Sequence, residues 1–139
     1  MLVFPAFGRS LEDFIKDLKK KNNKKPFTID NFVYIFQQIA SAVFEIQVKG
    51  FVHRDISSDN ILINEDYEIK LIDFGYVNNI SRLRKTKIGT LMYLAPEIIE
   101  GRPYNQKVDV WALGILCYQI LYGVYMFRPK TKGLSEDEI

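Results

Sequence analysis

One polar loop and the two apolar runs that follow it constrain the fold of this chain more than any other feature. The loop covers residues 53–60, and the runs cover residues 61–63 and 69–72, with a turn-forming Asn-Glu-Asp sequence between them. Short runs rich in isoleucine and bounded by turn residues are typical of β-strands. The sequence therefore predicts a β-hairpin, which brings Asp55 of the loop toward Asp73, the residue that follows the second run.

Three short motifs stand in order along the chain, and their spacing carries more information than any one of them. They are His-Arg-Asp at residues 53–55 with Asn60 five positions after the aspartate, Asp-Phe-Gly at residues 73–75, and Ala-Pro-Glu at residues 95–97. In this order they resemble the motifs of the eukaryotic protein kinases, and the Gly-Thr sequence before Ala-Pro-Glu resembles the serine/threonine group. The resemblance implies a mainly α fold with a small β hairpin, a partial protein-kinase-like C-lobe.

The resemblance treats the whole chain as one partial protein kinase domain. Residues 1–8 resemble the hinge, residues 9–127 resemble most of the C-lobe, and residues 128–139 resemble the start of a truncated remainder. Met1 falls where the last strand of the small lobe of a kinase would already be running. We therefore expect the N-lobe to be absent, together with its glycine-rich loop and its phosphate-binding lysine.

The resemblance also implies a role for each acidic or amide residue of the motifs. Asp55 would accept the proton of the substrate hydroxyl, and Asn60 and Asp73 would bind Mg²⁺, which prefers oxygen ligands. ATP would be the phosphoryl donor, and a serine or threonine of a protein substrate would be the acceptor. The single histidine, His53, is expected to pack against Phe74 and not to act as a general base.

The nucleotide contacts are expected at the start of the chain and in the hairpin. By the resemblance, adenine would bond to the Pro5 carbonyl and the Phe7 amide, and Leu62 is a third candidate for nucleotide binding. Proline lacks an amide hydrogen but keeps its carbonyl, so Pro5 suits this role. Thr86, which lies in a basic segment, is the candidate phosphorylation site, with Ser81 as a weaker one.

One position of the polar loop departs from the kinase pattern. Serine/threonine kinases usually have a lysine two residues after the catalytic aspartate, and this chain has Ser57 there. Losing one preorganised cation from a phosphoryl-transfer site lowers activity steeply. We therefore expect the chain by itself to be a weak catalyst or an inactive one. The alternatives are a non-catalytic, pseudokinase-like interaction module, whose protein partner supplies the missing surface, and a decayed fragment.

Two helices and one loop are predicted around the hairpin. Apolar residues recur at helical spacing from Phe32 to Ile46, and Lys49 and Gly50 are suited to end that helix. Residues 108–122 are apolar on nearly every side, which predicts a helix buried all round. The lysine-rich residues 19–25 are expected to form a solvated loop.

Composition narrows the class of protein. The formal net charge is only +2, and the basic residues are spread over several segments, so nucleic-acid binding is not expected. No run approaches the roughly 20 apolar residues of a membrane span, so membrane insertion is not expected. The single cysteine, Cys117, argues against a disulfide framework. We therefore expect an intracellular protein of the cytoplasm or nucleus.

Overall fold

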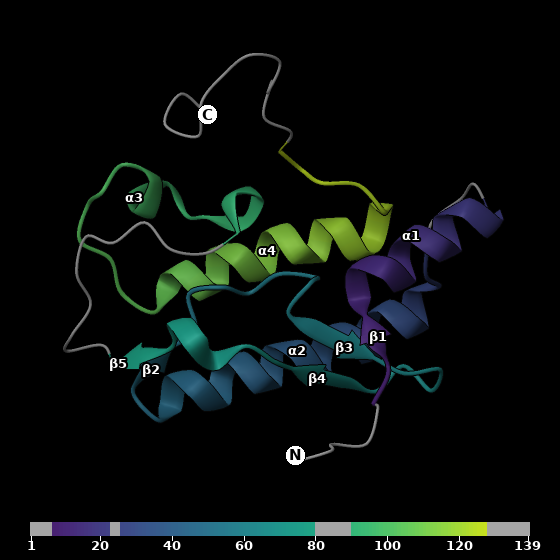
Figure 1. Ribbon diagram of the computed structural model, residues 1–139, viewed down its shortest axis with the longest axis horizontal. Helices are drawn as coiled ribbons and strands as arrows, with labels where there is room; N and C mark the ends of the chain where they lie inside the picture. Colours follow the sequence, from purple (N-terminus) through teal and green to yellow (C-terminus); the bar gives the residue numbers. More distant parts are fainter. Residues whose placement is uncertain (1–6, 23–25, 80–89, 128–139) are drawn as a thin grey trace, which may run out of the picture.

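The computed structural model describes residues 7–22, 26–79 and 90–127, and most of these residues lie in helices (Figure 1). The helices are α1 (Leu11–Asn22), α2 (Ile29–Val48), α3 (Pro96–Ile99) and α4 (Lys107–Tyr122), with 3₁₀ turns η1 (Phe74–Tyr76) and η3 (Leu91–Tyr93). Strands β1 (Arg9–Ser10), β3 (Ile61–Ile63) and β4 (Ile69–Leu71) form one antiparallel sheet in the order β1-β3-β4, and β2 (Phe51–Val52) pairs with β5 (Asn78–Asn79). The predicted fold class, mainly α with a small β-hairpin, is confirmed.

Strands β3 and β4 form the predicted hairpin. The Asn64 side chain organises the turn between them, because its Oδ1 accepts hydrogen bonds from the amides of Asp66 (3.1 Å) and Glu68 (2.9 Å). Asparagine side chains commonly bond to the backbone two residues on and so mimic a backbone turn. The local sequence thus accounts for the hairpin and for its register, in which Ile61 lies opposite Leu71.

Strand β1 adds an edge to this hairpin that the sequence did not predict. It pairs antiparallel with β3, and Gly8 just before it passes very close to the β3 backbone. A Cβ atom at Gly8 would lie 2.2 Å from the carbonyl oxygen of Ile63. The chain therefore needs glycine at this position, because any side chain would overlap a backbone atom.

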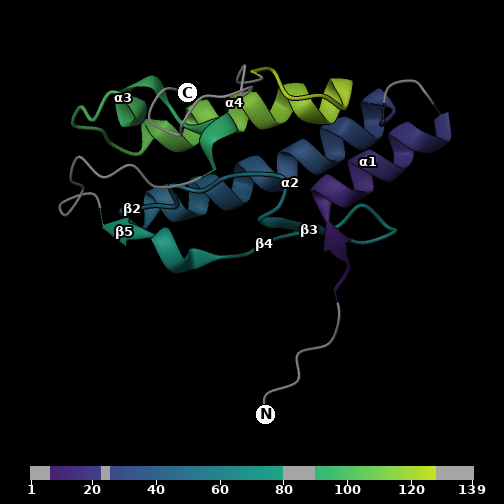
Figure 2. The same cartoon turned by 45° about the horizontal axis from the view of Figure 1, so that its top comes forward.

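Helix α2 confirms the helix predicted from Phe32 to Ile46, with one more turn at its start. Thr28 caps it by accepting a hydrogen bond from the Asn31 amide (3.3 Å). Gly50 follows its C-cap with φ of +78°, a conformation that glycine adopts without strain. In Figure 2, α2 lies between α4 and the strands, and it contacts α4, β2 and β4.

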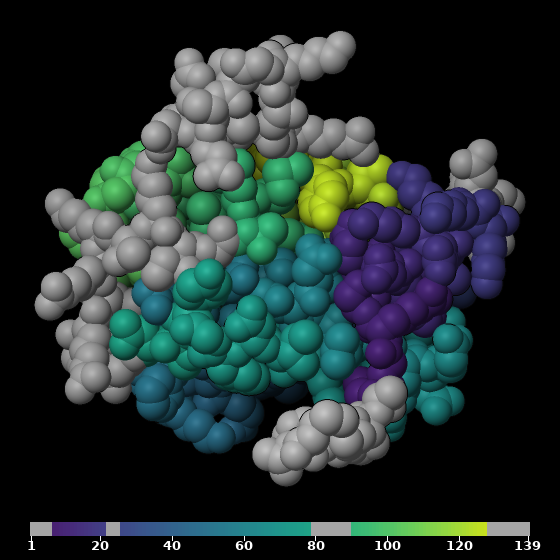
Figure 3. Space-filling model, in the orientation of Figure 1, coloured from purple at the N-terminus to yellow at the C-terminus, as the bar shows by residue number. Residues whose placement is uncertain are grey.

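The prediction of a solvated loop at residues 19–25 is wrong for residues 19–22, which form the last turn of α1. Positive side chains near the C-terminal end of a helix are stabilised by the helix dipole, so lysines suit this turn. Lys19 also donates to the Gly123 carbonyl (3.1 Å), just after α4. Figure 3 shows α1 in purple against the yellow C-terminal end of α4. Residues 23–25 lie outside the described part of the chain.

The prediction that residues 108–122 form a helix is confirmed as α4, but the expectation of burial all round is wrong. Val110, Trp111 and Tyr122 are 54%, 39% and 49% exposed. The opposite face of α4 packs on α2 and η3 and carries the buried residues. Trp111 stacks on Phe127 at 6.4 Å between ring centroids. An apolar sequence thus shows that much of a helix surface is hydrophobic, but it does not show which faces other elements cover.

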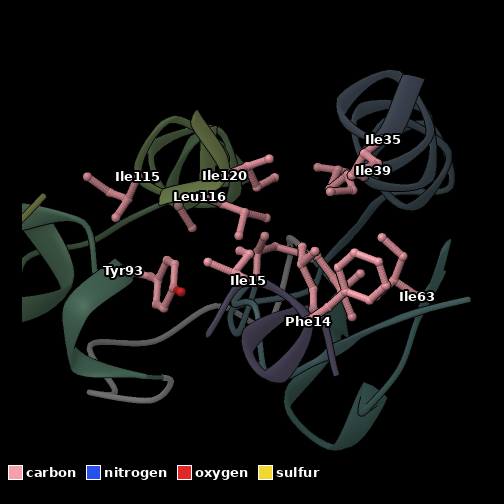
Figure 4. Packing of buried hydrophobic residues seen from close by; sticks show 14 of the residues in the cluster. Phe14, Ile15, Ile35, Ile39, Ile63, Tyr93, Ile115, Leu116 and Ile120 are labelled. Carbon is pink, nitrogen blue, oxygen red and sulfur yellow. The ribbon is translucent and has the colours of Figure 1, made fainter. Parts of the chain in front are cut away.

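The main core lies between α1, α2, α4 and the hairpin (Figure 4). Ile115 and Leu116 of α4 lie on the side of Tyr93 and α1, and Ile120 points toward Ile39 of α2. Ile35 and Ile39 of α2 lie on the side of Ile63 and Phe14. These side chains come from segments far apart in sequence, so their burial ties both ends of the described chain together. In the described ranges, no helix combines the length and hydrophobicity needed to cross a membrane.

Candidate active site

The polar loop of residues 53–60 is held at its start by a buried carboxylate. Asp109 of α4 is 1% exposed and accepts hydrogen bonds from the amides of His53 (2.8 Å) and Arg54 (2.9 Å). Burial raises the pKa of the Asp109 carboxyl, against the opposing effect of the two amide bonds. Arg54 has a positive φ of 71°, so these bonds also hold the loop in a turn that few residues other than glycine adopt.

Asp55 has its carboxylate fixed by three hydrogen bonds. Asn60 Nδ2 donates to Oδ2 (2.7 Å), and the amide and hydroxyl of Thr90 both donate to Oδ1 (2.7 and 2.9 Å). Asp55 is 9% exposed. A carboxylate has about four acceptor positions, so one remains for a further donor. The arrangement suits a residue that receives a proton in a defined direction.

The hairpin places the segment that leads to Asp73 beside Asn60. The amide of Ile72, the residue before Asp73, donates to the Asn60 carbonyl (2.9 Å). Both amide protons of Asn60 Nδ2 go to Asp55, to its carboxylate and to its backbone oxygen (3.0 Å), which leaves the Asn60 Oδ1 atom without a hydrogen bond in the described structure. Asp73 is exposed, and Gly75 bonds to only one of its carboxylate oxygens (3.1 Å).

These oxygen atoms fit Mg²⁺ as a partial ligand set. The described residues contain no group of three or more His, Cys, Asp or Glu side chains that could hold a metal ion. Mg²⁺ is commonly bound by one or two carboxylates together with water and substrate phosphates, so a site with Asp73 and the Asn60 amide oxygen matches its chemistry. Asp73 has φ of 60°, a backbone state that aspartate tolerates better than most residues.

His53 packs against Phe74, as predicted. The two rings meet edge to face, with their centroids 5.2 Å apart, and His53 is fully buried. Burial lowers the pKa of His53, despite the opposing charges of Asp109 and Asp55. The imidazole is therefore neutral at neutral pH, and its ring contact links the polar loop to the Asp-Phe-Gly segment.

The predicted nucleotide contacts are only partly within the described chain. Phe7 is half-buried, and Lys70 Nζ lies 4.2 Å from the centroid of its ring. Leu62 is also half-buried, in the middle of β3, where it pairs with Lys70 of β4 and Ser10 of β1. Three other predicted site residues lie outside the described ranges: Pro5, Ser81 and Thr86.

The sequence did not indicate two groups of residues that hold the loop. Asp109 stands alone as an acid in an apolar helix, and this was the one available signal for its role. Glu12 of α1 and Gln119 of α4 are also buried, and both bond near Ser58 of the loop. No local pattern predicts that these two side chains meet, because 107 positions separate them.

Comparison with known proteins agrees with this geometry. A family model described as "Protein kinase domain" matches residues 1–139. The chain belongs to the protein kinase family. The family predicted from the three motifs is thus confirmed, and the order of loop, hairpin and Asp-Phe-Gly segment in the structure is that of a partial kinase C-lobe.

The similar kinases include several named Aurora kinase. One from Candida glabrata is 40% identical over 123 residues, which is 87% of this chain and 34% of the relative. Aurora kinase C of Mus musculus is 43% identical over 100 residues, covering 71% of this chain and 36% of the relative. An Aurora kinase of Schizosaccharomyces pombe is 48% identical over 99 residues, covering 70% and 28%. The chain spans about a third of the length of the relatives it matches.

Proposed function

We propose that this chain carries out phosphoryl transfer from ATP to a serine or threonine hydroxyl of a protein substrate, with Asp55 as the proton acceptor. The observation that carries the proposal is the Asp55 carboxylate, fixed by Asn60 and Thr90 with one acceptor position left open. A general base must lie within hydrogen-bond reach of the proton it accepts, in a defined orientation. The three hydrogen bonds provide that orientation before a substrate arrives.

Asn60 and Asp73 are the proposed ligands of Mg²⁺. Their segments are joined by the bond from Ile72 to the Asn60 carbonyl, and the Asn60 side chain presents its oxygen because its nitrogen is held by Asp55. Protein kinases use ATP and Mg²⁺, and the metal neutralises charge that develops on the phosphates. The proposed adenine contacts are the Pro5 carbonyl, the Phe7 amide and Leu62.

The proposal includes a low rate for this chain. Ser57 has no positive charge, and its hydroxyl is fully buried without a hydrogen-bond partner in the described structure. Arg54, the cation of the same loop, donates to the Tyr76 carbonyl and to the Tyr104 hydroxyl (3.4 Å). The same observation favours a second candidate, a non-catalytic interaction module that binds a protein partner. For either candidate we propose an intracellular location, the cytoplasm or nucleus, because the first requires ATP and a protein substrate.

The test is a transfer assay on the purified chain. The protein and its Asp55→Asn variant are incubated with radiolabelled ATP, Mg²⁺ and a general protein substrate. Because a positioned base contributes roughly 10²- to 10⁴-fold, we expect the substitution to remove at least 99% of a weak signal. The matched control is Asp66→Asn, because Asp66 is an exposed residue of the hairpin turn. This variant should keep the wild-type level of phosphoryl transfer.

Two results would contradict the proposal. A signal that survives Asp55→Asn would come from a contaminating kinase. Absence of transfer in the wild-type chain, with Mg²⁺ and ATP in excess, would leave the interaction module as the better account. Thr86 and Ser81 remain proposed phosphorylation sites, and mass spectrometry of protein from its native cell tests both.

A further inference from the structure

Ser58 has a partner for every polar atom, and the partners lie on two other elements. Its amide donates to the Tyr93 hydroxyl (3.3 Å), and its carbonyl accepts from the Glu12 amide (3.1 Å). Its Oγ donates to Glu12 Oε2 (2.6 Å) and lies 2.9 Å from the Tyr93 hydroxyl. Ser58 is fully buried, so its polar atoms depend on these partners. Helix α1 and the η3 turn therefore both hold the loop between Asp55 and Asn60.

The Glu12 carboxylate that bonds to Ser58 is itself held by two other side chains. Glu12 is 5% exposed, its Oε2 accepts a second bond from Gln119 of α4 (2.5 Å), and its Oε1 pairs with Lys16 one turn along α1 (3.1 Å). The Tyr93 hydroxyl completes the cluster by donating to Gln119 Oε1. Burial acts to raise the pKa of Glu12, but the bonds from Ser58 and Lys16 help to lower it below its ordinary value, so the carboxylate is ionised at neutral pH. Hydrogen bonds to an ionised acceptor are among the stronger ones in proteins.

The loop is therefore held at both ends by carboxylates from different helices. Asp109 of α4 holds the amides of His53 and Arg54, and Glu12 of α1 holds Ser58. Asp55 lies between these two attachments in the sequence. Ser58 lies two residues before Asn60, whose amide bonds to the carbonyl of Ser57 (3.2 Å). A shift of Ser58 would move Asn60 with it.

We propose that Ser58 and Glu12 are positioning residues, whose hydrogen bond sets the place of Asn60 relative to Asp55. This inference rests on the proposed function, because it concerns the same site and reaction. Neither residue touches the reacting atoms. The bond matters because a displacement of about 1 Å in a positioned site can cost roughly 10²-fold in rate. Without it, Asn60 keeps its own bonds to Asp55 and residue 58 keeps its backbone bonds, but the loop before Asn60 loses one restraint on its position.

The neighbouring serine provides a matched control. Ser57 and Ser58 are both fully buried in the same loop, but the Ser57 hydroxyl has no hydrogen-bond partner in the described structure. Alanine at either position removes one buried oxygen. Only Ser58→Ala breaks the side-chain bond to Glu12, while the backbone bond from the Glu12 amide remains. A difference between the two variants therefore reports on the bond and not on the loss of a hydroxyl group.

The first measurement is amide hydrogen exchange by NMR on the whole chain, with no nucleotide present. Ser58→Ala is expected to speed exchange at the Asn60 and Ile72 amides at least about 10-fold, while Ser57→Ala leaves both rates at the wild-type value. The Asn60 amide bonds to Ser57 and the Ile72 amide bonds to the Asn60 carbonyl, so both report on the place of Asn60. Equal rates in the two variants would overturn the proposal.

The second measurement is the transfer assay, with kcat and the KM for ATP determined separately. Ser58→Ala is expected to lower kcat by roughly 10- to 100-fold and to leave the KM for ATP within about two-fold, because the proposed adenine contacts lie elsewhere. Ser58→Thr keeps the hydroxyl and should recover most of kcat. An unchanged kcat in Ser58→Ala would overturn the proposal, as would a loss that appears only in KM.

The two measurements separate the two proposals. One outcome is that the wild-type chain shows no phosphoryl transfer while Ser58→Ala, unlike Ser57→Ala, speeds exchange at the Asn60 and Ile72 amides. That result would support the positioning role and contradict the proposed function. If Ser58→Ala does not fold, Glu12→Leu replaces it in both measurements, because leucine is of similar size and has no oxygen to accept the Ser58 hydrogen bond. Wild-type exchange and kcat in Glu12→Leu would then overturn the proposal.

Discussion

Replacing Asp109 by alanine should destabilise the chain by a predictable amount. The Asp109 carboxylate is 1% exposed, and each of its oxygens accepts one hydrogen bond, from the amides of His53 and Arg54. Alanine leaves both amides without their acceptor, and each such loss costs about 1–3 kcal/mol, so the sum is about 2–6 kcal/mol. Burial raises the pKa of Asp109, which means that holding the charge inside is itself costly. Removing the charge recovers part of that cost, so we expect Asp109→Ala to lower the free energy of unfolding by about 2–4 kcal/mol.

Asparagine at the same position separates the hydrogen bonds from the packing. Asp109→Asn keeps the shape and one acceptor oxygen, but its NH₂ group faces one of the two amides. We therefore expect it to cost about 1–3 kcal/mol, which is less than the cost of alanine. The assay is urea unfolding followed by far-ultraviolet circular dichroism, with the free energy of unfolding extrapolated to water.

The control is Asp66→Ala, because Asp66 is exposed in the hairpin turn and should change stability by less than about 0.5 kcal/mol. If Asp109→Ala costs less than about 1 kcal/mol, the reasoning is refuted. A total stability of about 5–15 kcal/mol is usual for a domain, so alanine could unfold a chain at the lower end. If Asp109→Ala is unfolded, Asp109→Asn is measured in its place. A free energy of unfolding for Asp109→Asn equal to that of Asp66→Ala would then refute the reasoning.

Two further predictions concern glycine and histidine. Gly8→Ala should destabilise the chain by about 1–3 kcal/mol, because its Cβ would lie 2.2 Å from the Ile63 carbonyl oxygen. Gly114→Ala should stabilise the chain by about 0.5–1 kcal/mol, because a Cβ there on α4 would lie in open space. Thermal unfolding measures both, and shifts of the same sign would contradict the geometry. Burial lowers the pKa of His53 in the folded protein below its value of about 6.5 in the unfolded chain. The neutral His53 therefore makes its full contribution to stability above a pH of about 6.5, and that contribution is lost as the pH falls toward the pKa of the folded protein. From pH 7 to pH 5 the wild type should lose up to about 1.4 kcal/mol per pH unit relative to His53→Gln, and parallel urea midpoints for the two proteins would argue against this.

The features that were predictable from the sequence are local in origin. The hairpin follows from two isoleucine-rich runs around a turn that the Asn64 side chain closes. Helix α2 follows from apolar spacing, with Thr28 as its cap and Gly50 after its end. Propensity, capping and turn chemistry act over a few residues, so a single sequence displays them directly.

The errors and omissions have a different physical cause. Residues 19–22 were predicted as a loop because lysine is polar, but these lysines end a helix, where Lys19 meets the carbonyl of Gly123. Strand β1 was not predicted, because its two residues become a strand only beside β3. In α4 the exposed Trp111 and Val110 show that composition does not reveal which face is covered.

For the candidate site, the sequence alone determined which groups are present and in what order. The aspartates at positions 55 and 73 and the amide of Asn60 are set by motifs that span 23 residues of the chain. Only the tertiary structure decided how they are held. Asp109 and Glu12 hold the loop from two different helices, and Thr90 bonds to Asp55 from 35 residues away. Such contacts depend on the packing of distant segments, and no spacing within a motif encodes them.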